Sequence, residues 1–344
     1  MRRRLSFGGV LVMLGAALTA AGADAPYRLV SRFALGGDGG WDYLTADPFS
    51  HRLFVARATR VQVLDVQTGR LIGEIQGTDG VHGVALAPEL GSGYTSNGRS
   101  GSVTVFDLKT LKSTATIQIA GKNPDAIVYE PISKRVFTFN GGSSDATAID
   151  AKSHAVLGAV ALNARPEFAV ADGRGTIFAN LEDRNAIAAI DARSLKVTGT
   201  WPIAPCEEPS GLAIDREHRR LFSVCRNKLM AVLDADSGRL ITTLPIGAGV
   251  DGAAFDPNAG LAFSSNGSGT VTIVREEAPD RFTVAVEVPT QRGARTIALD
   301  ETTRRLYLPT AEFGRTPAPT PENPRPRPSI VPGSFVVLVL EPAR

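Results

Sequence analysis

The sequence is poor in cysteine, in aromatic residues and in net charge. Its 344 residues include 37 Lys and Arg against 35 Asp and Glu, so the basic excess typical of nucleic-acid-binding domains is missing. The two cysteines stand nineteen positions apart, which is not the C-x-x-C spacing of redox motifs or zinc knuckles. With 43% hydrophobic and 21% charged residues, the composition is that of a folded protein and excludes disorder, a collagen-like chain and a multi-span membrane protein.

The first residues have the pattern of a secretory signal peptide. Three arginines at positions 2–4 precede an apolar stretch that reaches about position 20, and small residues at 21–23 suit a signal peptidase. We expect residues 1–23 to be removed, which leaves residues 24–344 as a single domain without a membrane anchor, in the periplasm or secreted. Without the three leader arginines, 34 basic residues face 35 acidic ones. In an oxidising compartment Cys206 and Cys225 are expected to form a structural disulfide.

A short segment recurs seven times along the mature chain, at intervals of 40 to 44 residues. The copies are WDYLTADP from Trp41, HGVALAP from His82, DAIVYEP from Asp125, EFAVADG from Glu167, SGLAIDR from Ser210, DGAAFDP from Asp251 and RTIALDE from Arg295. Each copy is followed by further short runs of alternating apolar and β-branched residues, which are typical of strands. A repeat of this length, without helical periodicity, indicates a ring or an array of small sheets.

We predict an all-β fold, a seven-bladed β-propeller of four-stranded antiparallel blades. A straight solenoid would need atypical capping repeats, whereas both termini here look like parts of one split blade. The seventh copy supplies strands near Thr296, near Leu306 and over 334–340, and the segment 27–35 can add the fourth strand and close the ring. The proline-rich segment 315–333 is expected to be an insertion in this last blade, either a solvated loop, a docking arm or a lid.

The segment GYTSNGRSGSVTVFDLKTLKSTATIQIAGKNPDAIVYEPISKRVFTFNG, from Gly93, resembles the YVTN repeat of YncE-like bacterial β-propellers. The matching features are the Ser-Asn step at Asn97, the valine-rich strand that ends in Asp107, and the Pro-Asp step at Asp125. The resemblance spans nearly all of the mature chain. It implies a periplasmic propeller with a binding function and transfers no catalytic residue. The low aromatic content and the absence of repeated Trp-Asp endings argue against a WD40 identity.

Two sets of repeat positions are expected to share one mouth of the central channel. In an antiparallel blade the start of the first strand and the end of the second strand lie at the same edge. The first set is Asp42, His82, Asp125, Glu167, Ser210, Asp251 and Arg295, and the second is Arg57, Asn97, Asn140, Asn180, Cys225, Asn266 and Thr310. Trp41, beside Asp42, is placed either to stack on a ligand or to pack between blades.

Carboxylates that converge from several blades repel one another unless a proton, a hydrogen bond or a cation compensates them. We therefore take as ligand-binding candidates Trp41, the first set without Ser210, and the four asparagines. A divalent metal is a possible cofactor, held by Asp42, His82, Asp125, Glu167 and Asp251. The plainer alternative is that these carboxylates and amides serve only backbone turns.

Our leading hypothesis is a non-catalytic, monomeric propeller that binds a small ligand, a metal ion or a protein partner at this mouth. The first alternative is a metal-assisted lactonase or lyase with His82 as the base, since His82 is the one imidazole placed between carboxylates of adjacent repeats. The second alternative is an interaction scaffold or a single-stranded DNA binder. The near-neutral charge argues against nucleic acid.

Overall fold

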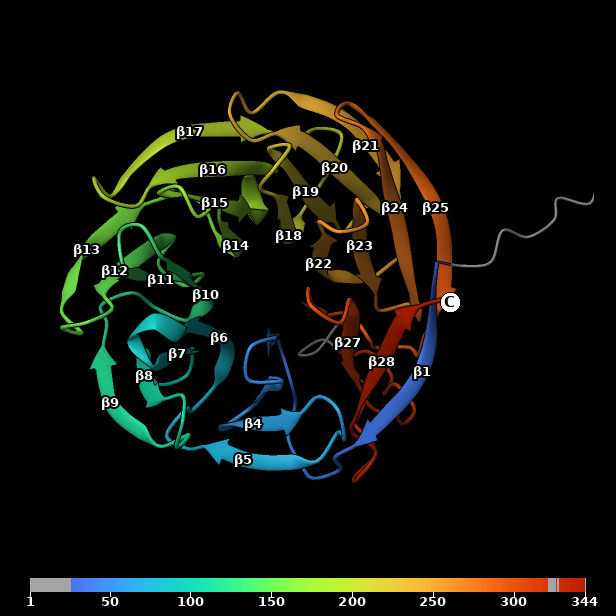
Figure 1. Ribbon diagram of the computed structural model, residues 1–344, viewed down its shortest axis with the longest axis horizontal. Helices are drawn as coiled ribbons and strands as arrows, with labels where there is room; N and C mark the ends of the chain where they lie inside the picture. Colours follow the sequence, from blue (N-terminus) through green and yellow to red (C-terminus); the bar gives the residue numbers. More distant parts are fainter. Residues whose placement is uncertain (1–25, 321–325, 327, 344) are drawn as a thin grey trace, which may run out of the picture.

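The computed structural model describes residues 26–320, 326 and 328–343 (Figure 1). The predicted signal peptide, residues 1–23, lies outside this part of the chain. Within it, no helix is both long and apolar enough to cross a membrane.

Seven antiparallel four-stranded sheets form a ring and follow one another in chain order, with the first strand of each innermost (Figure 1). Blades 1 to 3 are β2 (Leu44–Asp47), β3 (Arg52–Arg57), β4 (Arg60–Asp65), β5 (Leu71–Ile75); β6 (Val81–Ala87), β7 (Ser92–Asn97), β8 (Ser102–Asp107), β9 (Ser113–Gln118); and β10 (Pro124–Glu130), β11 (Arg135–Asn140), β12 (Asp145–Asp150), β13 (Val156–Ala161). Blades 4 to 6 are β14 (Pro166–Ala171), β15 (Thr176–Leu181), β16 (Ala186–Asp191), β17 (Lys196–Pro202); β18 (Pro209–Asp215), β19 (Arg220–Cys225), β20 (Leu229–Asp234), β21 (Leu240–Pro245); and β22 (Val250–Asp256), β23 (Leu261–Asn266), β24 (Thr270–Ala278), β25 (Arg281–Pro289). Two single-turn 3₁₀ helices, η1 (Pro88–Leu90) and η2 (Glu182–Arg184), lie between strands.

Blade 7 is built from both ends of the chain and confirms the predicted closure. Its strands are β26 (Ala298–Asp300), β27 (Arg305–Thr310), β28 (Val336–Pro342) and β1 (Tyr27–Ala34). In Figure 1 the blue N-terminal strand lies along the red C-terminal strand, and the two pair antiparallel from Tyr27 opposite Pro342 to Ala34 opposite Val336. The all-β, seven-bladed architecture predicted from the repeat is therefore confirmed.

The aspartate that ends the third strand of most blades shapes the turn to the fourth strand. In blade 3, one carboxylate oxygen of Asp150 accepts hydrogen bonds from the backbone N–H of Lys152 at 3.0 Å and of Ser153 at 2.7 Å. Such bonds to the charged form lower the pKa of Asp150. These repeated aspartates are turn residues and belong to no site.

The hydrophobic core lies between the blades. Each pair of neighbouring blades shares one cluster of buried side chains, and the cluster between blades 7 and 1, for example, joins Val337 and Val339 to Leu53 and Val55. Burial of apolar area between rigid sheets therefore stabilises the ring as a whole. Cys206 and Cys225 form a disulfide, with Cα atoms 5.7 Å apart, within blade 5.

The insertion between β27 and β28 is anchored where it leaves and rejoins the blade. Phe313 forms an isolated bridge with Ile330, Gly314 N–H donates to the carbonyl of Ser329 at 2.9 Å, and Val331 N–H donates to the carbonyl of Glu312 at 2.9 Å. These bonds hold the two ends of the insertion to each other, and Phe313 packs against Trp41, which precedes the first strand of blade 1.

Candidate functional site

The first set of repeat positions forms a ring at one mouth of the channel. We call these residues the mouth ring: Asp42, His82, Asp125, Glu167, Ser210, Asp251 and Arg295. They lie at, or just before, the start of the seven innermost strands. Hydroxyl groups of neighbouring blades hold the backbone there, because Thr296 donates to the carbonyl of Asp42 at 3.0 Å and Ser96 donates to the carbonyl of Asp125. Ser96, the serine of the Ser-Asn step, thus forms a hydrogen bond between blades 2 and 3.

Asp42, His82 and Asp125, the mouth triad, come from blades 1 to 3 and meet around one nitrogen. His82 Nδ1 lies 2.6 Å from Asp42 Oδ2 and 3.6 Å from Asp125 Oδ1. Gly98 makes room for the imidazole, since a Cβ at that position would lie 2.6 Å from His82 Nε2. One imidazole and two carboxylates thus offer one ligand atom each, within 4.8 Å of one another.

Burial and charge set the protonation of the mouth triad. Burial alone would lower the pKa of His82, but the hydrogen bond to Asp42 and the charges of Asp125 and Asp42 outweigh it and raise the pKa. Burial raises the pKa of Asp125 to about 7, with the charges of Asp42 and Asp251 adding to it and that of His82 opposing it. A cation in this group would compete with the protonation of His82 and Asp125.

The other side of the mouth ring carries an ion pair and a carboxyl group with a raised pKa. Arg295 Nη1 lies 2.6 Å from Asp251 Oδ2, which joins blades 7 and 6. Burial, followed by repulsion from Asp125 and Asp251, raises the pKa of Glu167 to about 9, so that this side chain is uncharged at neutral pH. The mouth ring therefore contains a carboxyl group whose protonated form is favoured at neutral pH.

An aromatic pair closes the channel below the mouth ring. Tyr43 follows Asp42, Phe168 follows Glu167, and their ring centroids lie 4.8 Å apart in an edge-on arrangement that spans blades 1 and 4. Burial, and then the charges of Asp125, Asp251, Asp42 and Glu167, raise the pKa of Tyr43. Its hydroxyl therefore stays protonated at neutral pH. The repeat spacing did not predict this floor, and its signal in the sequence was the aromatic residues that follow two of the ring positions.

A cavity of about 610 Å³, which we call the mouth cavity, opens above the mouth ring on the side of blades 4 to 7. Its carboxylate and cationic lining is Glu167, Glu182, Glu208, Asp251, Arg226 and Arg295, and its apolar lining includes Trp41, Phe313, Pro328 and Ile330. Trp41 packs against Phe313 and Phe335 with centroid separations of 6.1 and 5.2 Å. Its buried Nε1 has no hydrogen-bond partner among the described residues. Two residues of the predicted insertion, Pro328 and Ile330, thus border the mouth.

The second set of repeat positions does not line the mouth, which corrects the expected double ring. Asn97, Asn140, Asn180 and Asn266 are completely buried. Asn140 accepts from Thr138 at 3.0 Å and donates to Asp145 at 2.6 Å and Thr147 at 2.9 Å, all within blade 3. Asn97 and Asn266 make the same kind of contacts in blades 2 and 6, and Asn180 donates to the carbonyls of Ser210 and Gly211. Their amides stabilise the blades and their interfaces.

The remaining members of this second set are also engaged inside the protein. Cys225 is in the disulfide, and the hydroxyl of Thr310 donates to the carbonyl of Arg292 at 2.8 Å. The guanidinium of Arg57 lies 3.7 Å over the ring of Phe335 and donates to the carbonyls of Gly36 and Asp38. The last side chain of each second strand is buried inside the ring of blades. The side chains of the mouth ring, at the start of the innermost strands, face the channel instead.

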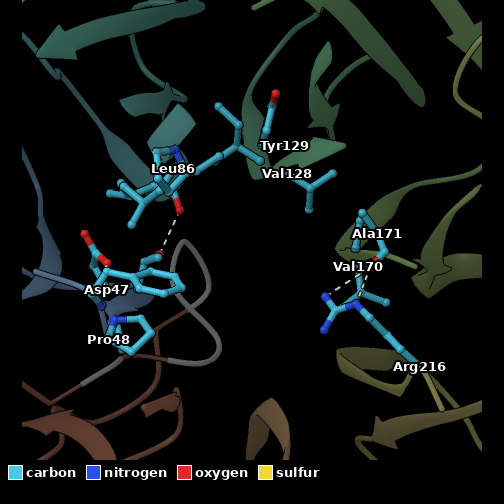
Figure 2. Close-up of a pocket in the computed structure, with 16 residues that line it drawn as sticks. Asp47, Pro48, Leu86, Val128, Tyr129, Val170, Ala171 and Arg216 are labelled. Carbon is cyan, nitrogen blue, oxygen red and sulfur yellow. Dashed lines mark hydrogen bonds between the residues drawn. The ribbon is translucent and has the colours of Figure 1, made fainter. Parts of the chain in front are cut away.

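The opposite end of the channel has a different chemistry. A cavity of about 360 Å³ lies there, between the ends of the innermost strands of blades 1 to 4, and Figure 2 shows residues that line it. Its lining is mainly apolar and includes Pro48, Leu86, Val128 and Val170. Arg216 lies at its edge and donates twice to the carbonyl of Ala171, at 3.2 and 3.1 Å. The channel is therefore polar at one mouth and apolar at the other.

Sequence comparison gives a short match to one bacterial protein. No family model matches the chain. A stretch of 66 residues, 19% of this chain, is 38% identical to Antigen Lp49 of Leptospira interrogans serogroup Icterohaemorrhagiae serovar copenhageni (strain Fiocruz L1-130). That stretch spans only 14% of Lp49. The match is too short to establish a family, and membership of the YncE-like propellers stays a prediction.

Solved structures share the fold at low sequence identity. Hydrazine synthase of Kuenenia stuttgartiensis aligns with a TM-score of 0.69 and 18% identity over 80% of this chain and 94% of that chain. U3-55K aligns with a TM-score of 0.75 and 10% identity over 93% and 99% of the two chains, and the WD40 repeats of RRP9 give nearly the same values. At these identities the likeness shows the propeller fold alone.

Proposed function

We propose that this protein is an exported binding protein that captures a small, positively charged organic ligand in the mouth cavity, without covalent chemistry. The observation that carries the proposal is the composition of that cavity, where four carboxyl groups face two guanidinium groups beside an aromatic wall. Arg295 is paired with Asp251, Arg226 with Glu208, and Arg165 with Glu182. Glu167 is the carboxyl group of this lining without an ion pair among the described residues, and a ligand that brings positive charge would favour its ionised form.

Each part of the cavity has a role in this proposal. Trp41 and Phe313 would receive a flat or methylated part of the ligand, because aromatic faces attract cations and apolar groups. Glu167 would accept the charged group, and Trp41 Nε1, buried and without a partner among the described residues, would donate to a ligand oxygen. The insertion residues Pro328 and Ile330 would cover the ligand at the rim.

Ligand binding should be coupled to proton release. The pKa of Glu167 lies near 9 and falls when a cation approaches its carboxyl group. At pH 7.5 the group is protonated before binding and ionised afterwards, so one proton leaves the protein. Calorimetric heats in two buffers of different ionisation enthalpy measure that proton directly.

The test uses a Trp201→Phe variant, in which Trp41 is the only remaining tryptophan. Agmatine, choline and acetate are titrated while Trp41 emission is followed, and we expect the two cations but not acetate to change it. Glu167→Gln should weaken binding at least about tenfold and remove the proton release, whereas the exposed control Glu301→Gln should do neither. Binding that is equal for acetate and for the cations, or that survives Glu167→Gln unchanged, would contradict the proposal.

A second candidate function is favoured by the mouth triad. Asp42, His82 and Asp125 present a ligand set that suits a divalent transition metal, and a metal there is the condition for the lactonase or lyase alternative. Elemental analysis of protein purified without chelator tests it. Stoichiometric metal that is lost in His82→Ala would support a metal site, whereas a metal-free wild type that also fails to bind added Mn²⁺ or Zn²⁺ at the mouth would exclude it.

A further inference from the structure

An acidic residue ends the innermost strand of most blades and caps the turn that follows. One oxygen of Asp172 accepts from the N–H of Arg174 at 2.8 Å, and one oxygen of Asp256 accepts from the N–H of Asn258 at 3.0 Å. Asp215 does the same in blade 5, accepting from the N–H of Glu217 at 2.9 Å. The second oxygen of each carboxylate is left for another partner.

In two interfaces that partner is an arginine of the following blade. Arg219 Nη1 lies 3.1 Å from Asp172 Oδ2 between blades 4 and 5, and Arg304 Nε lies 2.7 Å from Asp256 Oδ2 between blades 6 and 7. Both arginines occupy the same repeat position, immediately before the second strand, and both have a positive φ of 59°. The repeat thus places a cation beside a buried aspartate.

The interface in between, of blades 5 and 6, reverses this charge. The equivalent position is Gly260, and Glu276 of β24 lies against it, since a Cβ on Gly260 would be 3.8 Å from the Cβ of Glu276. A second carboxylate therefore faces Asp215 where the neighbouring interfaces have a guanidinium. The side chains of Asp215 and Glu276 are only 2% and 5% exposed.

His218 completes the group, which we call the rim triad: Asp215, His218 and Glu276. His218 Nδ1 lies 2.8 Å from Asp215 Oδ2 and 3.3 Å from Glu276 Oε1. Outside the rim triad, neither carboxylate oxygen of Glu276 has a hydrogen-bond partner among the described residues. The three ligand atoms lie within 4.8 Å of one another.

We propose that the rim triad binds a zinc-class divalent metal ion that joins blades 5 and 6. An imidazole nitrogen with two carboxylate oxygens is a common three-residue ligand set for zinc, and calcium and magnesium prefer oxygen alone. Two ligand atoms that each lie about 2.1 Å from a tetrahedral zinc ion stand about 3.4 Å apart. The 3.3 Å between His218 Nδ1 and Glu276 Oε1 already fits this geometry, whereas the 2.8 Å between His218 Nδ1 and Asp215 Oδ2 must increase by about 0.6 Å. Water fills the fourth position, because the His218 side chain is 50% exposed.

When no metal is bound, protonation of His218 and Glu276 compensates the charge of the buried carboxylates. Burial alone would lower the pKa of His218, but Glu276 and Asp215 outweigh it and raise the pKa, while burial and the charge of Asp215 raise the pKa of Glu276. Two arginines beside the triad are already paired: Arg219 with Asp172 and Asp236, and Arg220 with Asp234 and Asp280. Arg220 also donates to the carbonyl of His218 at 2.7 Å, which fixes the turn.

The rim triad is separate from the mouth. Asp215 ends β18 and Ser210 of the mouth ring lies near its start, so the two sites stand on opposite faces of the disc, about 16 Å apart along the strand. A variant that removes a ligand from one site leaves the other site intact, so such variants show which of the two sites binds an added metal.

The test titrates Co²⁺ and Zn²⁺ into metal-stripped protein in a His82→Ala background, which removes the imidazole of the mouth triad. We expect one equivalent of Co²⁺ to give visible absorption and to be displaced by one equivalent of Zn²⁺. His218→Ala and Glu276→Gln should each weaken Zn²⁺ binding at least about tenfold. His51→Asn, at an exposed turn in blade 1, is the matched control and should bind like its parent.

Two outcomes would overturn the proposal. The first is the absence of saturable Zn²⁺ binding in the His82→Ala protein. The second is binding that both His218→Ala and Glu276→Gln leave unchanged, which would place the metal elsewhere. Thermal unfolding of every variant without metal shows that it is folded, and a rise in Tm with Zn²⁺ in the parent and in His51→Asn, but not in His218→Ala or Glu276→Gln, ties the ion to the rim triad.

Discussion

At the scale of single residues, Glu167 shows most clearly what the mouth ring costs the fold. Its pKa is about 4.5 in an unfolded chain and about 9 in the folded protein, mainly because of burial and secondly because of Asp125 and Asp251. Between these two values the folded protein holds a proton that the unfolded chain has released. The free energy of unfolding therefore falls as pH rises from about 4.5 to about 9. Below this window Glu167 makes the free energy of unfolding neither rise nor fall with pH, and above it the whole stabilisation due to the bound proton is lost.

Glu167→Gln keeps the shape of the side chain and removes its titration. We expect the Tm of this variant to fall less than that of the wild type between pH 5 and pH 9, with a difference of at least about 2 °C at pH 9. Thermal unfolding by circular dichroism across this range measures it. The exposed Glu301→Gln should follow the wild type, and parallel pH profiles for Glu167→Gln and wild type would show that Glu167 ionises normally.

The repeat spacing predicted the mouth ring but not its chemistry. A period of 40 to 44 residues is enough to bring Asp42, His82 and Asp125 to one edge. The direction in which a side chain points at the end of a strand depends on local twist and bulges, and register shifts do occur early in several innermost strands. This is why the asparagines, expected at the mouth, lie inside the blades, and why the floor made by Tyr43 and Phe168 was missed.

At the scale of the blade, the buried asparagine is a hydrogen-bonded brace between the second and third strands. Asn140→Ala would leave Thr138, Asp145 and Thr147 without this partner, and we expect the free energy of unfolding to fall by about 2 to 4 kcal/mol. Urea unfolding measures the loss. The exposed Asn258→Ala, which removes one hydrogen bond to the carbonyl of Glu301, should cost about 1 kcal/mol or less.

A binding measurement separates this structural role from the one expected from the sequence. Folded Asn140→Ala should bind the cationic probes of the mouth cavity like the wild type, because Asn140 is completely buried and does not line that cavity. A loss of probe binding together with unchanged stability would show that the asparagines belong to the binding site after all.

The strands themselves were predictable from the sequence because alternating apolar residues mark them. The contacts of the insertion at the mouth were not, because they depend on tertiary packing that no local pattern encodes.

At the scale of the whole molecule, one strand decides whether the ring is closed. Tyr27 of β1 is completely buried, packs edge-on against Phe263 at 5.0 Å and donates through its hydroxyl to Asp256 at 3.2 Å, so the strand that completes blade 7 also contacts blade 6. Without β1, the whole edge of β28 would be unpaired, and an unpaired edge is a site for aggregation.

Deletion of residues 27–34 should therefore abolish cooperative unfolding rather than lower its midpoint, because the clusters between blades depend on one another around the ring. Calorimetry and urea unfolding followed by two probes test this, with coincident transitions expected for the wild type and non-coincident or missing ones for the deletion. Val30→Thr, on the more exposed face of the same strand, is the control and should keep a single transition. A deletion variant that unfolds in one sharp step near the wild-type Tm would mean that the remaining three strands of blade 7 close the ring without β1.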